Sequence, residues 1–123
     1  MIPRSSVLIV DQSAETRQVL RTALERRGLR IFEASRADVG LELARQHHPD
    51  LIVLDMEVQP ADSEASADAF AATGEGQAAT IVMLGTLRRN DQPAGQFVSK
   101  PYHFKPLVSK IEQLLAARHG AAA

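Results

Sequence analysis

Three short apolar runs occur along the chain, at residues 7–10, 51–54 and 81–84. Each run consists of Val, Ile, Leu or Met, and no polar residues alternate with them. Such runs are typical of strands that are buried on both faces of a parallel sheet. Two weaker apolar segments, at residues 29–33 and 97–98, predict two further strands.

The intervals between the first strands carry helical patterns. A first helix is predicted over residues 13–27, where Ser13 is the candidate N-cap and Gly28 follows as a stop. A second helix begins at the Ser-Arg-Ala-Asp sequence of residues 35–38, which resembles a capping box, and it ends near His47. The faces expected to point into the core are Val19, Leu20, Ala23 and Leu24 in the first helix and Val39, Leu43 and Ala44 in the second.

Two further helices are predicted nearer the C-terminus. An alanine-rich segment at residues 63–73 has Asp62 or Ser63 as its candidate cap. The last helix repeats apolar residues at helical spacing, namely Leu107, Val108, Ile111, Leu114 and Leu115. Residues 86–96 contain too few apolar positions for an amphipathic helix, so the fourth helix of a regular alternation is expected to be shortened or absent.

Strand and helix alternate about five times along the chain, which predicts an α/β fold. The expected architecture is a doubly wound, five-stranded parallel sheet with helices on both faces. The length of 123 residues suits one domain. We assign that domain to residues 1–119 and interpret residues 120–123 as a flexible tail or the start of a linker.

Composition narrows the classes of function. The formal net charge of -1 provides no overall attraction to nucleic acid or to an anionic membrane surface. The absence of cysteine excludes disulfides, thiolate metal sites and a cysteine nucleophile. The apolar runs are too short to span a membrane, so a cytoplasmic setting is expected, with neither nucleic acid nor membrane as a direct partner.

Candidate chemistry lies where the strands end, because open α/β sheets bind ligands at the carboxyl ends of their strands. Asp11 and Gln12 follow the first strand, and Asp55 closes the third. Gly85 and Thr86 follow the fourth strand, and Lys100 and Pro101 follow the fifth. Two carboxylates and an ammonium group would converge there, a combination suited to holding a divalent cation and a phosphoryl group.

Three sequence segments carry a family resemblance. They are Val-Leu-Ile-Val-Asp at residues 7–11, His-Pro-Asp-Leu-Ile-Val-Leu-Asp at residues 48–55, and Val-Ser-Lys-Pro at residues 98–101. Through them the chain resembles the receiver domain of two-component response regulators and is similar to the chemotaxis response regulator. The resemblance extends over essentially the whole chain, and it implies the flavodoxin-like receiver fold.

The resemblance also implies a set of roles. Asp55 would accept a phosphoryl group from the phosphohistidine of a histidine kinase or phosphotransfer protein. Mg²⁺ would be held by Asp11, by the Asp55 carboxylate and by the backbone carbonyl of Glu57. Lys100 would pair with the phosphoryl group, and the peptide bond between Lys100 and Pro101 would be cis.

Some positions depart from the family pattern. Gln12 stands where a second acidic metal ligand is usual, so Mg²⁺ is expected to bind more weakly, with Gln12 a weak ligand by position only. Gly85 stands where a Ser or Thr switch hydroxyl is usual, and Thr86 follows one place later. Neighbouring residues on a strand point to opposite faces, so Thr86 would substitute only after a backbone shift. Phe97 occupies the place of the switch aromatic.

Three functional hypotheses follow. The first is a phosphorylatable, non-enzymatic signalling receiver that switches the binding of a downstream output protein or domain, with homodimerisation open. The second is a pseudo-receiver that docks proteins without phosphorylation, because Gln12 and Gly85 weaken the site. The third is a flavodoxin-like nucleotide or flavin carrier, which is disfavoured because no glycine-rich loop follows the first strand and aromatic residues are only 4% of the chain. At the level of single residues, Asp11 as a simple helix cap is the competing interpretation.

Overall fold

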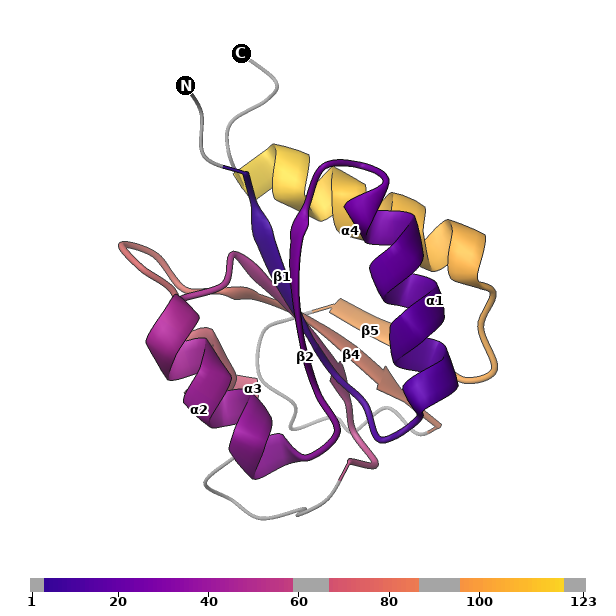
Figure 1. Ribbon diagram of the computed structural model, residues 1–123, viewed down its shortest axis with the longest axis horizontal. Coiled ribbons are helices and arrows are strands. Elements are labelled where there is room, and N and C mark those ends of the chain that lie inside the picture. The colour runs from indigo at the N-terminus through magenta and orange to yellow at the C-terminus, as the bar shows by residue number, and fades with distance from the viewer. Residues whose placement is uncertain (1–3, 59–66, 87–95, 119–123) are drawn as a thin grey trace.

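The computed structural model describes residues 4–58, 67–86 and 96–118 of the chain. Its centre is a five-stranded parallel sheet in the order β2-β1-β3-β4-β5 (Figure 1). The strands are β1 (Ser6–Val10), β2 (Arg30–Ala34), β3 (Leu51–Asp55), β4 (Thr80–Gly85) and β5 (Gln96–Ser99). The predicted five-stranded parallel sheet is therefore confirmed.

Four helices are present in the described part of the chain: α1 (Ala14–Glu25), α2 (Ala37–His47), α3 (Ala67–Ala71) and α4 (Phe104–Arg118). Helices α1 and α4 lie side by side on one face of the sheet, and α2 and α3 cover the other (Figure 1). This is the doubly wound α/β architecture that the sequence predicts. The expected loss of a helix between β4 and β5 concerns residues 87–95, which lie outside the described ranges. The same is true of residues 62–66, with the predicted cap, and of the tail at 120–123.

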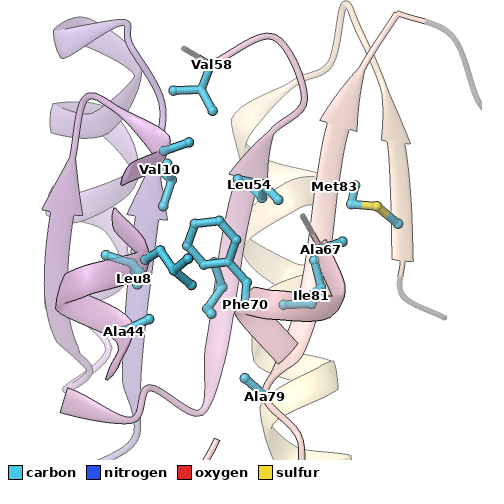
Figure 2. Close-up of a cluster of buried hydrophobic side chains, with 13 residues drawn as sticks. Leu8, Val10, Ala44, Leu54, Val58, Ala67, Phe70, Ala79, Ile81 and Met83 are labelled. Carbon is cyan, nitrogen blue, oxygen red and sulfur yellow. The ribbon is translucent and has the colours of Figure 1, made fainter. Parts of the chain in front are cut away.

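Two apolar layers hold the helices on the sheet. The central strands β1 and β3 are buried along their whole length, so they supply side chains to both layers. Leu8, Val10 and Ile52 pack with α2 and α3, and Phe70 of α3 lies in the middle of this layer (Figure 2). The layer under α1 and α4 is made by the alternate strand positions Val7, Ile9, Leu51 and Val53, together with Leu107 and Ile111 of α4. Continuous apolar runs thus mark strands buried on both faces, as the sequence predicts.

The predicted helix faces are partly wrong. Val39 is 48% exposed and Val19 38% exposed, whereas the buried residues of α2 are Ala37, Gly40, Leu41 and Ala44. In α2 the reason is Gly40, where an added Cβ would come within 2.8 Å of a Val10 methyl group. The absent side chain lets α2 approach β1 along a face that a hydrophobicity pattern does not mark.

The helix caps were predicted with mixed success. The Ser13 side chain accepts a hydrogen bond from the Thr16 backbone at 3.2 Å, so it caps α1 as expected. At α2 the expected capping box is wrong: Arg36 is the N-cap residue and makes no side-chain cap hydrogen bond. The first turn of α2 instead contains Asp38, whose carboxylate accepts from the Val39 backbone at 2.9 Å.

Candidate phosphoryl-acceptor site

Asp55 lies at the carboxyl end of the central strand β3, and it is only 3% exposed. Its Oδ1 atom accepts a hydrogen bond from the Glu57 backbone N–H at 3.0 Å. The same oxygen accepts from the Lys100 ammonium at 2.8 Å. The strand order places β3 between β1 and β4, so the residues that follow both neighbouring strands lie beside this carboxylate.

Lys100 is brought to the site by the end of β5. Its backbone N–H donates to the Gly85 carbonyl at 2.8 Å, which extends the pairing of β4 with β5 by one residue. The Lys100–Pro101 peptide bond is cis, as the family resemblance implies. Burial disfavours the ammonium, but the hydrogen bond and negative charge of Asp55 prevail, helped by the charge of Glu57, so the pKa of Lys100 is raised. The ammonium is therefore charged at neutral pH.

Asp11 follows β1 and is 3% exposed. Its backbone N–H donates to the Ala34 carbonyl at 3.0 Å, and its Oδ1 accepts from the Ser13 N–H at 2.8 Å. Burial raises the pKa of Asp11, and the negative charge of Asp55 acts in the same direction. The hydrogen bond from Ser13 and the cationic neighbours oppose this rise without cancelling it. Asp11 thus combines a helix-entry contact with a buried charge.

The raised pKa of Asp11 predicts that Asp11→Asn stabilises the free protein at neutral pH. The folded pKa lies above the ordinary value of 3.8, so ionisation of Asp11 lowers stability as pH rises from that value through the folded pKa. Asparagine removes this cost and keeps an oxygen for Ser13. We expect a gain of about 0.5–2 kcal/mol in the free energy of unfolding, measured by urea denaturation.

The control for this experiment is Asp38→Asn. Asp38 is fully exposed, and a hydrogen bond from Arg36 lowers its pKa, so its charge does not oppose folding. This variant should be no more stable than the wild type. A stability of Asp11→Asn that is equal to or below that of the wild type at neutral pH would contradict the prediction.

A pocket of about 560 Å³ opens at this edge of the sheet. It brings together seven of the predicted site residues: Asp11, Gln12, Asp55, Glu57, Thr86, Lys100 and Pro101. The same pocket is lined by Ser13, Thr16, Tyr102 and Phe104, none of which the sequence assigns to the site. Their positions carried a signal, since Tyr102 directly follows the Lys-Pro pair and Thr16 falls in the first turn of the first helix.

The donor atoms of the pocket suit a hard cation. Two buried carboxylates, from Asp11 and Asp55, lie close enough for the charge of Asp55 to raise the pKa of Asp11. Carboxylate and carbonyl oxygens are the ligands that Mg²⁺ takes in proteins. Among residues 4–58, 67–86 and 96–118, no group of three His, Asp or Glu side chains is arranged to hold a metal ion. The chemistry therefore fits Mg²⁺ with two carboxylates from the protein.

The predicted switch residues separate into two places. A Cβ built on Gly85 would lie 3.4 Å from both the Met56 Cβ and a ring carbon of Phe97, so this position faces those two side chains. Thr86 is exposed and lines the pocket. Thr86 therefore brings a hydroxyl group to the pocket while β4 and β5 keep a regular register, in which Gly85 pairs with Ser99.

The sheet order, with two buried carboxylates and a lysine at the carboxyl ends of the strands, defines a flavodoxin-like α/β domain with a polar site at that edge. A family model for the response regulator receiver domain matches residues 7–112. The chain therefore belongs to the response regulator receiver domain family. As a receiver domain it is a module of two-component signal transduction.

Curated relatives agree with this assignment. The chain is 31% identical over 124 residues to the KDP operon transcriptional regulatory protein KdpE of Escherichia coli, covering 95% of this chain and 53% of that protein. It is 25% identical over 117 residues to the protein PilH of Pseudomonas aeruginosa, covering 89% of this chain and 97% of PilH. The chain thus spans about half the length of KdpE and of several other curated relatives, and nearly all of PilH.

Solved structures show the same fold. A CheY-like receiver domain protein from Methanospirillum hungatei matches with a TM-score of 0.81 at 19% identity, covering 97% of this chain and 99% of the other. The chemotaxis protein CheY4 of Vibrio cholerae matches with a TM-score of 0.74 at 20% identity, covering 90% of this chain and 98% of that one. At these identities the likeness concerns the fold alone.

None of the helices in the described ranges combines the length and the apolar character needed to cross a bilayer.

Proposed function

We propose that this receiver domain accepts a phosphoryl group on Asp55 from a histidine kinase or phosphotransfer protein. The modification would switch its binding to a downstream output protein or domain. The observation that carries the proposal is the buried Asp55 carboxylate, whose Oδ1 atom lies 2.8 Å from the Lys100 ammonium in the pocket shared with Asp11.

The contacts of Asp55 support a role as nucleophile. Within the described part of the chain, its hydrogen bonds from Lys100 and the Glu57 backbone both end on Oδ1. This leaves Oδ2 as the oxygen that attacks phosphorus. The new O–P bond forms as the bond between phosphorus and the donor's histidine nitrogen breaks, and that nitrogen keeps the electron pair. Lys100 then neutralises charge on the transferred group.

Mg²⁺ is the cofactor that the site would take. Asp11, the Asp55 carboxylate and the Glu57 backbone carbonyl would hold it, and Gln12 offers only a neutral amide oxygen at the fourth position. When bound, the ion supplies charge neutralisation for the phosphoryl oxygens. Because affinity for such cations depends on the charge of the ligands, we infer weaker binding than three carboxylates would give.

Transmission of the signal is proposed to involve Thr86 and Phe97. Thr86 borders the pocket, whereas Phe97 packs beside Gly85 and Met56 at the end of β4. Added charge on Asp55 would reorganise the loops that follow β4 and β5. The same proposal includes a surface that binds the output partner. It also includes a homodimer and a cytoplasmic setting.

A pseudo-receiver that docks proteins without phosphorylation is the second candidate. Two departures from the family pattern favour it. Gln12 stands in the pocket where a carboxylate is usual, and Gly85 stands at the end of β4 where a side-chain hydroxyl is usual. In that case Asp55 and Lys100 would serve as a stable ion pair that fixes the ends of β3 and β5.

Phosphorylation by acetyl phosphate distinguishes the two candidates. We expect intact-mass spectrometry to show one added phosphoryl group per chain in the presence of Mg²⁺ and a sharply reduced yield with a chelator, because the ion neutralises the transferring oxygens. A chain that gains no mass from acetyl phosphate, and none from a phosphorylated histidine kinase, would overturn the acceptor role and favour the docking function.

A further inference from the structure

Tyr102 forms a wall of the pocket that the proposed chemistry leaves unused. Its ring packs edge-on against Phe104, with ring centres 5.6 Å apart and planes at 85°. It also borders the apolar layer beneath α1 and α4. Both aromatic residues line the pocket that contains Asp11 and Asp55. Packing therefore holds the ring in one place, at the edge of the proposed phosphorylation site.

The phenol is oriented by the first turn of α1. A hydrogen bond with the Thr16 side chain acts to lower the pKa of Tyr102. When the Thr16 hydroxyl donates this bond, the phenol proton is left for a different acceptor. Burial raises the pKa of Tyr102 overall, and the negative charges of Asp11 and Asp55 add to the rise. The phenol is consequently a protonated donor at neutral pH, within the field of the two carboxylates.

A phosphoryl group on Asp55 would need several donors. It carries three terminal oxygens, over which negative charge is spread during transfer. Lys100 supplies one cationic donor, but Gly85 supplies no side chain. A side chain added at Gly85 would point toward Met56 and Phe97. Thr86 is exposed to solvent. The half-buried Tyr102 phenol is better shielded from water, which strengthens a hydrogen bond to an anion.

We propose that the Tyr102 phenol donates a hydrogen bond to a phosphoryl oxygen on Asp55 and replaces the hydroxyl that Gly85 lacks. This inference rests on the proposed receiver function. In this arrangement Tyr102 contacts the transferred group directly, and Thr16 is a positioning residue that acts through the phenol.

The first test is the affinity for beryllofluoride, a phosphoryl mimic, measured with Mg²⁺ by isothermal titration calorimetry. Tyr102→Phe removes only the hydroxyl and keeps the ring that packs on Phe104. Loss of one net hydrogen bond should weaken binding about three- to tenfold. Ser109→Ala, which removes an exposed hydroxyl from α4, should bind as the wild type does. Equal affinities of Tyr102→Phe and the wild type would overturn the proposal.

The second test uses tyrosine fluorescence, which reports on Tyr102 alone because the chain contains one tyrosine and no tryptophan. Beryllofluoride with Mg²⁺ should change the emission of the wild type and leave that of Asp55→Asn unaltered. Thr16→Val should retain an emission change but weaken binding by a smaller factor than Tyr102→Phe. An emission that stays constant while calorimetry records binding would rule out contact with the phenol.

The two proposals fail in different ways. A wild-type chain that binds no beryllofluoride and gains no phosphoryl group would overturn the receiver function together with the role of Tyr102. A chain that binds and becomes phosphorylated, but is indifferent to Tyr102→Phe, would remove only the role of Tyr102.

Discussion

Asp55→Asn is expected to abolish phosphoryl transfer to the chain. The amide has no anionic oxygen to attack phosphorus, while its size lets the ends of β3 and β5 keep their positions. Its carbonyl oxygen retains an acceptor for Lys100, whose ammonium lies 2.8 Å from Oδ1 in the wild type. Intact-mass spectrometry after incubation with acetyl phosphate and Mg²⁺ should therefore show one added phosphoryl group on the wild type and none on the variant.

The matched control for this loss is Asp38→Asn. Asp38 lies in the first turn of α2 and is fully exposed, so the same chemical change there leaves the pocket intact. This control should be phosphorylated at the wild-type rate. A phosphoryl group that persists on Asp55→Asn would show that another residue is the acceptor, and peptide mapping would locate it.

The fold was predictable because its strongest signals are local. Residues 7–10, 51–54 and 81–84 are apolar on both faces, and only the middle of a sheet covered by two helical layers buries such runs completely. The facing of α2 was not predictable, because it depends on the close approach of Gly40 to Val10. A hydrophobicity pattern does not register a missing side chain, so it wrongly predicts that Val39 lies in the core.

The candidate site was predictable as a set of strand ends. Asp11, Asp55 and Lys100 each follow a buried strand, and parallel strands bring their carboxyl ends to one edge. What each side chain faces was less predictable. The register of β4 with β5 determines that Thr86 reaches the pocket and that Gly85 faces Phe97. The pairing of Tyr102 with Thr16 was not predictable, because the two residues lie 86 positions apart in the sequence.

The buried charge of Asp11 opposes folding, whereas Asp55 stabilises the charge of Lys100. Asp11 and Asp55 are each 3% exposed and repel one another, and Lys100 is the cation that contacts Asp55 directly. Buried like charges persist where the rest of the structure has stability to spare, and they commonly mark functional sites. The apolar layers on both sides of the sheet therefore have to contribute the free energy of unfolding that offsets the cost of these buried charges.

Phe70 is the residue whose loss should cost most of that stability. It is fully buried, and it lies in the middle of the layer between the sheet and α2 and α3 (Figure 2). Helix α3 has only five residues, so its own hydrogen bonds contribute little, and its attachment depends on this side chain. The Phe70 carbonyl also accepts a hydrogen bond from the Thr73 hydroxyl at 2.7 Å, which closes the turn after the helix.

Phe70→Ala should lower the free energy of unfolding by about 3–5 kcal/mol, measured by urea denaturation followed by circular dichroism. The loss combines the transfer of the ring to water with the cavity that rigid β-strands cannot fill. Phe32→Ala makes the same chemical change at a half-buried ring stacked on His47, and it should cost only about 1–2 kcal/mol. Equal losses from the two variants would mean that α3 is held by other contacts. A domain of this size has a free energy of unfolding of about 5–15 kcal/mol. Phe70→Ala would therefore remove much of the stability that offsets the two buried carboxylates.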